Sequence, residues 1–467
     1  MKYLWRGGIP ILVAVIVYLL PVPDGVEPTG MRMLGIFLGT ILALILQPLP
    51  TGSVALIGMA VAMLTRTETP AKALAGFANS TVWLIVAAFF IAEGFLLTGL
   101  GRRIALLFVT QLGRSTLGLS YGMALTDLIL VPATPSNTAR CGGVVYPVVA
   151  SLNQLEESYP EPEESRKRLG AYLTLTALQV NTVTSAMFLT AMAGNPVAQE
   201  AAGKLGIEIS WGRWALAAVV PGIVSLIAIP WVMSKIYPPT VTKTPEAPQL
   251  ARDQLREAGP MSAKEWIMVG TFVLLLVLWC LGDELGVDAT TAAFTGIAIL
   301  LVTGVLGWKD LADNTSAWST LVFFGVLVGM AAELNALGVI GWIGDSVAGS
   351  VDSLHWLAAF AILTLVYFYS HYLFASNTAH IVAMYAVFVG AAITTGAPPL
   401  FAALVFGFIG NLFGGLAHYS SGPAGVIYGS GYVKTPELFR IGFAISIVNI
   451  AIWTVIGGGW MKLIGIW

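Results

Sequence analysis

Long apolar runs, broken by short polar stretches, make up most of this chain. Near the N-terminus the pattern predicts three membrane spans, separated by turns that carry proline and glycine. Each is short for the roughly 20 residues that a span needs, so tilt or local thinning of the bilayer is expected. Later runs predict further spans. In chain order, these spans are predicted near residues 7–22, 31–48, 51–65, 214–234, 265–282 and 288–308.

Two further apolar segments are interrupted by the same polar tripeptide. Ser136-Asn137-Thr138 returns 240 residues later as Ser376-Asn377-Thr378, and a basic side chain follows two residues after each copy, Arg140 and His380. Inside a bilayer, polar side chains and unwound backbone are tolerated only where they line a cavity or face protein. One copy alone is more typical of a turn or a helix cap. Two copies in corresponding halves favour a binding site.

The sequence around the first tripeptide does not favour one continuous helix. Residues 117–152 contain Pro132, Pro135, Gly142-Gly143 and Pro147. Proline removes a backbone donor and breaks helices, so a re-entrant hairpin with the tripeptide at its tip is expected. The next apolar run is rich in hydroxyls and amides, which are typical of a helix that faces a cavity or protein.

The order of features repeats in the second half. Residues 79–83 and the Phe89-Phe90 pair are echoed by residues 314–318 and Phe323-Phe324. Interrupted apolar segments at corresponding positions indicate the midplane binding site of a transporter. Four parts are therefore predicted: N-terminal scaffold helices, a first inverted repeat, a cytoplasmic linker and a second inverted repeat. Their bounds are 1–75, 76–236, 237–264 and 265–467.

Composition supports this interpretation. The chain is 57% hydrophobic and 10% charged, whereas soluble domains carry about 25% charged residues. It is therefore predicted to be an all-α integral membrane protein. The net charge of −2 argues against nucleic acid as a partner, which would require a basic face. Cys141 and Cys280 are expected to be small buried side chains, not a disulfide or a metal site.

Neither an enzyme nor a metal site is expected. No nucleophile-and-base motif, zinc-protease motif or aspartate dyad occurs in the spans. Three histidines, His371, His380 and His418, lie near the second tripeptide or the following break, but their spacing matches no ligand motif. A channel is disfavoured because inverted hairpins suit alternating access. We expect a secondary carrier without a cofactor.

Charge placement predicts the topology. Arg102-Arg103, residues 166–168 and the linker lie on one side, which the positive-inside rule makes cytoplasmic, while Asp283-Glu284 lies on the other. About eleven transmembrane helices plus two re-entrant hairpins follow. The N-terminus is then cytoplasmic and the repeats are inverted. We expect a multi-pass protein of the inner (plasma) membrane.

The paired tripeptides resemble the divalent anion/sodium symporter (DASS) family of dicarboxylate and citrate carriers, from about residue 78 onward. Residues 135–140, 191–196 and 418–424 are most similar to the branch of 2-oxoglutarate/malate translocators and citrate/succinate or tartrate/succinate antiporters. The resemblance implies an elevator-type motion of a transport domain against a scaffold, and a homodimer. It also implies that the substrates are di- or tricarboxylates such as malate, succinate, 2-oxoglutarate, citrate or tartrate.

The residues themselves suit such a substrate. A dicarboxylate needs donors at both ends, which the amides and hydroxyls of the two tripeptides supply, assisted by helix N-termini. The sequence does not decide which acid is preferred. The predicted substrate-binding residues are Ser136, Asn137, Thr138, Ser376, Asn377, Thr378, Gly194, Asn195, Gly422 and Pro423.

The two basic side chains bear on ion coupling. A fixed guanidinium within ~5 Å of a cation cavity repels sodium by several kcal/mol at intermediate dielectric. Arg140 and His380 are therefore predicted to compensate charge in place of sodium, which makes the carrier a sodium-independent antiporter. Two alternatives stay open. Arg140 could instead snorkel or pair with Asp127, and the protein could be a sodium-coupled symporter of the same family.

Overall fold

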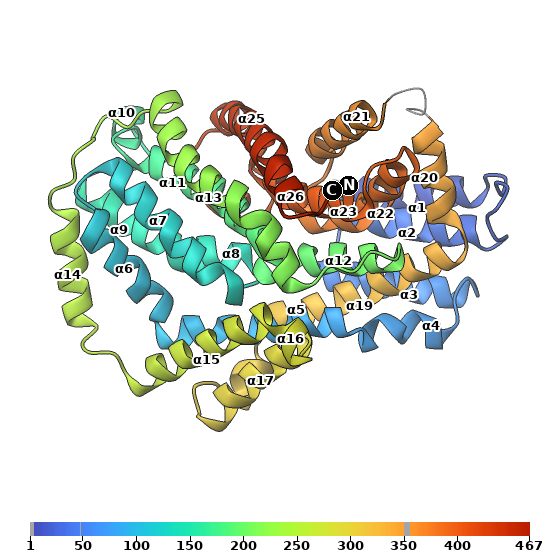
Figure 1. The fold of residues 1–467 in the computed structure, drawn as a ribbon, viewed down its shortest axis with the longest axis horizontal. Helices are drawn as coiled ribbons and strands as arrows, with labels where there is room; N and C mark the ends of the chain where they lie inside the picture. Colours follow the sequence, from blue (N-terminus) through green and yellow to red (C-terminus); the bar gives the residue numbers. More distant parts are fainter. Residues whose placement is uncertain (1–3, 47, 350–354) are drawn as a thin grey trace. The chain divides into compact units, whose positions relative to one another are not determined.

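The computed structural model describes residues 4–46, 48–349 and 355–467, and every regular element within them is helical (Figure 1). Within these described ranges, eight helices are long and apolar enough to cross a membrane, and five shorter apolar helices accompany them. The all-α integral membrane fold predicted from the sequence is thus confirmed. The eight long segments are Ser80–Thr98, Thr116–Ala133, Trp211–Ile236, Ala263–Cys280, Thr315–Ala336, Trp356–Leu373, Asn377–Thr394 and Thr435–Leu463.

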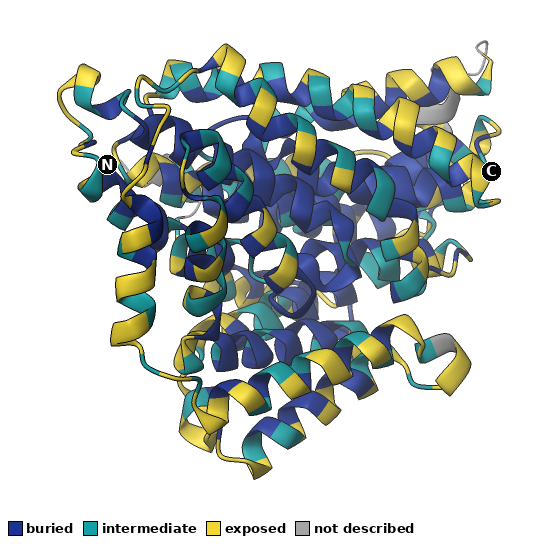
Figure 2. Ribbon diagram, turned by 60° about the vertical axis from the view of Figure 1, so that its left-hand side comes forward, coloured by how far each residue is buried: buried dark blue, intermediate teal, exposed yellow. Residues whose placement is uncertain are grey.

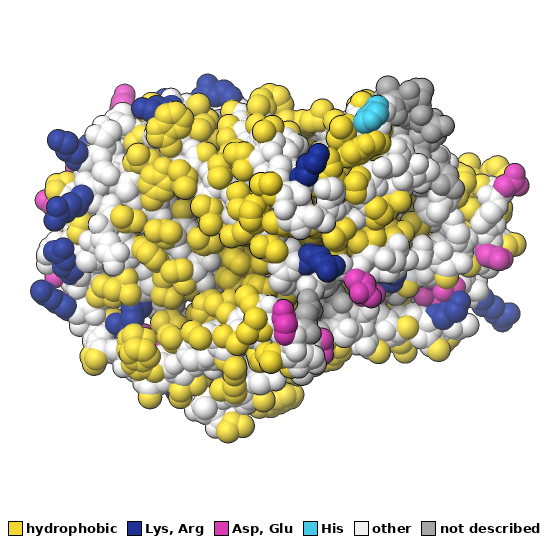
Figure 3. Space-filling model, viewed as in Figure 1, with side chains coloured by type: hydrophobic (Ala, Val, Ile, Leu, Met, Phe, Trp, Pro, Cys, Tyr) yellow, Lys and Arg dark blue, Asp and Glu magenta, His cyan; other side chains and the backbone are white. Residues whose placement is uncertain are grey.

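The outer surface has the character expected for contact with lipid. Figure 2 shows buried residues on the inward faces of the helices and exposed ones on the outward faces. Large apolar side chains are strongly exposed, among them Leu64 at 83%, Val302 at 88% and Leu463 at 82%. Hydrophobic side chains also cover much of the face in Figure 3. Exposed apolar area on this scale is stable only in a non-aqueous environment.

The chain divides into two compact units, and each is built from several separate stretches of sequence. The first unit comprises Met1–Ala87, Pro196–Ile209 and Asn314–Gly407. The second comprises Ala88–Asn195, Ser210–Asp313 and Phe408–Trp467. These units are not the sequence repeats, whose bounds stay a prediction.

In the first unit, helices α2 and α3 pack on the long helix α19. Their contact buries Phe37, Ile41, Leu327 and Met330, which together form its principal core. Helix α1 lies against α2, where a Cβ at Gly35 would stand 2.6 Å from the Ala14 carbonyl oxygen, so glycine permits the close approach. The helices of this unit are α1 (Leu4–Tyr18), α2 (Gly30–Leu46), α3 (Thr51–Leu64), α4 (Pro70–Ala75), α12 (Gly194–Lys204), which begins in the second unit, α19 (Thr315–Ala336), α20 (Val339–Gly349), α21 (Trp356–Tyr369), α22 (Asn377–Thr394) and α23 (Pro399–Leu412), which ends in the second unit.

Helix α11 (Gly170–Met187) is the centre of the second unit, because all of its residues are buried. It packs against α7 and runs beside α13 (Figure 1). Burial on every side explains why the sequence of α11 has no polar face. The surrounding helices are α5 (Ser80–Thr98), which begins in the first unit, α6 (Leu100–Leu112), α7 (Thr116–Leu130), α8 (Asn137–Ala139), α9 (Tyr146–Leu155), α10 (Glu163–Arg166), α13 (Trp211–Ile236), α15 (Ala263–Cys280), α16 (Gly282–Leu285), α17 (Ala289–Val302), α18 (Trp308–Ala312), α24 (Gly422–Gly429), α25 (Thr435–Ala451) and α26 (Gly458–Leu463).

The polar segment between the halves is more ordered than a simple linker. It contains helix α14 (Ala247–Glu257), which packs against α6 in the second unit. Nearby, the buried guanidinium of Arg166 binds both carboxylate oxygens of Glu437, at 2.5 and 3.0 Å, and so ties the short helix α10 to α25. These charged segments are therefore fixed to the second unit.

Candidate functional site

Both Ser-Asn-Thr tripeptides begin a helix in the same way. Ser136 is the N-cap of α8 and its hydroxyl accepts from the Ala139 N–H at 3.0 Å. Ser376 is the N-cap of α22 and accepts from the Ala379 N–H at 3.4 Å. Ser136 and Ser376 are therefore helix caps, the role that the sequence suggested for a single copy of the tripeptide. The asparagine and threonine follow in the first turn, where backbone N–H groups and the positive end of the helix dipole favour an anion.

A break in regular helix surrounds the first tripeptide. Helix α7 ends at Leu130, a 3-10 turn covers Val131–Ala133, and the helix resumes at Asn137. A π-helical turn, Arg140–Val145, then leads into α9, and such turns often mark functional sites. The tripeptide itself is half-buried, although Thr134 and Pro135 before it are buried. The predicted interruption of the span is therefore present, with its polar side chains accessible.

The second tripeptide lies in the first unit, and the first tripeptide lies in the second unit. Helix α21 continues into a 3-10 turn, Ser370–Leu373, and α22 begins at Asn377. Asn377 is buried at 5% exposure, while Ser376 and Thr378 are half-buried. Each unit therefore contains one of the two helix starts that carry the tripeptide.

A second helix start meets the first tripeptide. Ser421 caps α24 by accepting from the Ala424 N–H at 3.2 Å, and its hydroxyl donates to the Gly414 carbonyl oxygen at 2.8 Å. A Cβ at Gly422 would clash with the hydroxyl of Thr138 and stand 3.2 Å from its Cβ. Pro423 occupies the first turn, where its missing N–H costs nothing. Of the predicted site residues, the structure thus brings Thr138 and Gly422 into direct proximity.

Gly422→Ala is expected to lower transport at least tenfold, because the added methyl group displaces the Thr138 hydroxyl from the junction of the two helix starts. Gly425→Ala is the matched control: it lies on the same helix with open space around the added methyl. Initial rates in proteoliposomes, normalised to reconstituted protein, provide the measurement. Equal rates for the two variants would contradict a site at this junction.

Asn195 has a positioning contact that the sequence did not reveal. It is fully buried, and its amide donates to the carbonyl oxygens of Ser185 at 2.8 Å and Phe188 at 3.0 Å. Its side-chain oxygen accepts from Asn411 at 2.7 Å. The Asn195 side chain thus links the end of α11 to the last residues of α23, which belong to the second unit as α11 does. Gly194, beside it, begins α12.

Arg140 is fully buried at the centre of a polar cluster. Its Nε donates to Asp127 Oδ1 at 3.1 Å, so the pairing left open by the sequence is present. Its other nitrogens donate to the Ser185 hydroxyl at 2.9 Å, to the Ala191 carbonyl at 2.6 Å and to the Thr134 carbonyl. Burial of a charge requires such complete pairing. The guanidinium therefore takes up two backbone oxygens, one of them just before the tripeptide.

Helix α11 contributes further members of this cluster. The amide of Asn181 donates to Asp127 Oδ2 at 3.1 Å, and the Thr184 hydroxyl donates to the same oxygen. The sequence placed these polar side chains against a cavity or protein, and the structure shows that they face protein. In the sequence, the signal for this cluster was the high number of polar residues within one apolar run. The backbone carbonyl groups that accept from Arg140 could not be identified from the sequence, because every residue has such a group.

His380 is also buried, within aromatic rings. Its Nδ1 lies 3.0 Å from Nδ1 of His371, and its Nε2 lies 3.3 Å from the Ser370 hydroxyl. Phe374 stacks on it at 4.3 Å between ring centroids. Two ring nitrogens in contact need one donor and one acceptor, so this pair of histidines holds at most one positive charge. Among the described residues no group of three or more His, Cys, Asp or Glu side chains is arranged to hold a metal ion.

A membrane-embedded, twice-interrupted helical fold with capped helix starts defines a polytopic transporter. The chain belongs to the family described as the sodium:sulfate symporter transmembrane region, whose model matches residues 1–467. It is accordingly a multi-pass membrane transporter and not an enzyme. The resemblance to divalent anion/sodium symporters inferred from the tripeptides is confirmed.

Relatives cover nearly the whole chain. The putative malate transporter YflS of Bacillus subtilis is 48% identical over 460 residues, which cover 98% of this chain and 96% of that protein. The chloroplastic dicarboxylate transporter 2 of Spinacia oleracea is 45% identical over 98% of this chain and 83% of its own. The citrate/succinate antiporter of Escherichia coli is 34% identical, covering 97% of each.

A solved structure supports the fold alone. The YdaH transporter of Alcanivorax borkumensis superposes with a TM-score of 0.56 at 12% identity, covering 99% of this chain and 98% of that one. At this identity the likeness concerns the path of the chain.

Proposed function

We propose that this protein exchanges di- or tricarboxylates across the membrane, independently of sodium. Relatives named for malate, for dicarboxylates and for citrate/succinate exchange support this substrate class. Malate, succinate, 2-oxoglutarate, citrate and tartrate are the candidate substrates. A sodium-coupled dicarboxylate symporter of the same family is the alternative.

Substrate recognition in this proposal uses the helix starts. Backbone N–H groups at the starts of α8 and α24, with the side chains of Asn137 and Thr138, suit one carboxylate group. Asn377 and Thr378 at the start of α22, in the first unit, offer the same chemistry. The serines act by capping these helices. Gly194 and Asn195 shape the start of α12, while Gly422 and Pro423 shape that of α24.

The observation that carries sodium independence is the set of bonds made by Arg140. In sodium-coupled carriers, unwound backbone carbonyls coordinate the cation. Here the carbonyls of Thr134 and Ala191 accept from the guanidinium instead. Asp127 balances the charge of Arg140. Sodium is therefore excluded chiefly because the carbonyl oxygens that could bind it already accept hydrogen bonds from Arg140. The guanidinium of Arg140 is part of the protein, so it has no concentration gradient that could drive transport. The gradient of the counter-substrate drives transport instead.

His380 is proposed as the corresponding basic group at the second tripeptide. Its contact with His371 leaves room for one positive charge on the pair. We further propose an elevator-type motion, a homodimer, and a location in the plasma membrane with the N-terminus cytoplasmic. The positive-inside pattern supports the orientation.

Counterflow in proteoliposomes tests the proposal. Uptake of labelled malate, citrate, succinate, 2-oxoglutarate or tartrate is expected only into vesicles loaded with an unlabelled di- or tricarboxylate. Replacing external sodium by potassium is expected to leave the rate unchanged. Vesicles loaded with chloride provide the matched control. Robust sodium-driven uptake into chloride-loaded vesicles would establish the symporter instead, and transport of none of these acids would reject the substrate class.

A further inference from the structure

The first unit contains a cavity of about 520 Å³ whose lining residues are all apolar. This volume lies within the roughly 300–1,000 Å³ typical of ligand pockets. Helices α2, α19, α20, α21 and α22 contribute the lining, for example through Leu38, Ile343 and Met384. Two of its lining residues on α21, Ile362 and Val366, are 42% and 51% exposed. The cavity thus opens at the apolar outer surface of the unit.

Water does not suit this cavity. A buried water needs about two to four polar partners, and apolar cavities stay dry. Leaving the space empty forfeits the dispersion contacts of the lining atoms. Because the cavity opens at an apolar surface within the bilayer, lipid hydrocarbon is available to occupy it.

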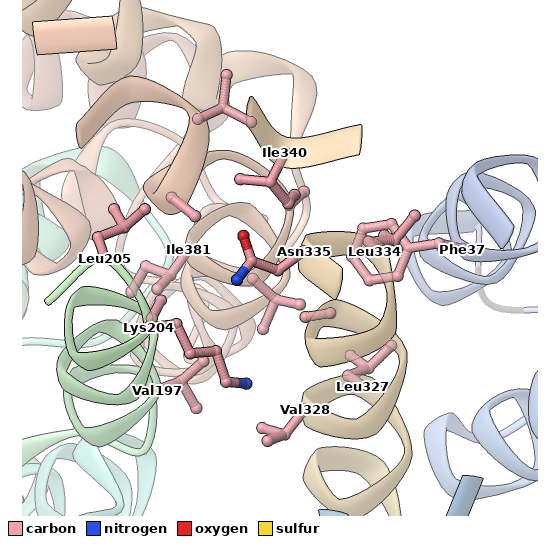
Figure 4. A pocket seen from close by; sticks show the side chains of 16 residues that line it. Phe37, Val197, Lys204, Leu205, Leu327, Val328, Leu334, Asn335, Ile340 and Ile381 are labelled. Atoms are coloured by element: carbon pink, nitrogen blue, oxygen red, sulfur yellow. The ribbon is translucent and has the colours of Figure 1, made fainter. Parts of the chain in front are cut away.

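A smaller cavity beside it supplies a polar end. The two cavities share five wall residues: Phe37, Leu334, Ile340, Ala383 and Val387. Lys204, from the last turn of α12, and Asn335, near the end of α19, also line the smaller one. Figure 4 shows both side chains among apolar neighbours, turned into the space. Side by side, the two cavities offer apolar space with an ammonium and an amide at one side.

The charges around Lys204 leave it able to bind an anion. Its Nζ lies 3.7 Å from Glu200, which also accepts from the Asn79 amide at 3.0 Å and the Thr81 hydroxyl at 3.3 Å. Glu200 therefore shares its charge among three donors. On the neighbouring α19, Glu333 is already paired with Lys72 at 2.8 Å.

We propose that these two adjoining cavities together bind one anionic phospholipid. An acyl chain fills the apolar chamber, and the headgroup phosphate accepts from Lys204 and Asn335. Basic pockets between membrane helices are suited to anionic headgroups. Because α22 lines both cavities through Ala383 and Val387, the bound lipid packs directly on the helix that begins at the second tripeptide.

Native mass spectrometry of the full-length purified protein, titrated with phosphatidylglycerol or phosphatidylcholine, tests this site. The wild type is expected to bind phosphatidylglycerol about five-fold more tightly, the preference that one ammonium group provides. Lys204→Gln is expected to abolish the preference while retaining chain binding. Ile362→Trp, which fills the opening, is expected to weaken both lipids. Glycerol phosphate alone is expected not to bind.

Two matched variants serve as controls. Lys235→Gln removes an exposed lysine from the last turn of α13, and Leu365→Trp enlarges another exposed side chain on α21 that does not line the cavity. Both are expected to behave like the wild type. The proposal is overturned if Lys204→Gln keeps the preference or Ile362→Trp leaves lipid binding unchanged. It is also overturned if Ile362→Trp alters only association with a second copy of the chain.

Discussion

Asp127→Ala is expected to reduce the recovery of folded transporter severely, because it leaves the buried guanidinium of Arg140 without its carboxylate. Breaking a buried ion pair costs about 3–5 kcal/mol. The monodisperse fraction after extraction and the midpoint of thermal unfolding measure the effect. Asp253→Ala, which breaks an exposed pair with Arg256 at 3.7 Å, is the control and is expected to cost about 0–1 kcal/mol.

The double variant Asp127→Ala with Arg140→Ala separates stability from transport. Removal of both charges leaves no unpaired ion, so part of the folded yield is expected to return. Exchange is expected to stay absent, because the carbonyls of Thr134 and Ala191 lose their cation. A well-folded double variant with wild-type exchange would show that Arg140 is only a structural partner.

Asn137→Ala and Thr378→Ala are each expected to lower exchange at least a hundredfold with little change in folded yield. Each removes a proposed substrate donor from the first turn of a helix whose serine cap remains. A site built to hydrogen-bond its substrate is severely impaired when such a group is missing. Initial rates and apparent affinities in proteoliposomes measure the loss.

Ser151→Ala is the control for this pair. It removes a hydroxyl from α9 that donates only to the Pro147 carbonyl, at 3.1 Å. Its exchange rate is expected to match that of the wild type. If Asn137→Ala or Thr378→Ala retains near-normal rates with unchanged affinity, the tripeptides are structural turns.

The sequence predicted the features that depend on local physics. Apolar runs identified the helices, and the repeated serine identified two helix starts with the same cap. Proline and glycine around residue 136 indicated the break that the structure has there. These properties follow from backbone hydrogen bonding within a few residues, which a single sequence displays.

Other features depend on contacts between distant residues. Asn195 and Asn411 are 216 positions apart, and nothing local indicates that their amides meet. The carbonyls around Arg140 belong to backbone, which every residue possesses. Helix α14 lies in a polar stretch that the sequence indicates to be a linker. Its few apolar residues are explained only by its packing against α6, which the local sequence does not show. The sequence therefore located the candidate residues better than their partners.

Within each unit, elements from one half of the sequence lie next to elements from the other half. In the second unit the helix start at Asn137 meets α24, which lies in the other half of the sequence. In the first unit α22 and α12, again from opposite halves, line one cavity. A ribosome adds about 5–20 residues per second, so Thr138 waits on the order of a quarter to a full minute for Gly422. During synthesis the first tripeptide must therefore stay in the membrane without its partner helix, and the site is completed only near the end of translation.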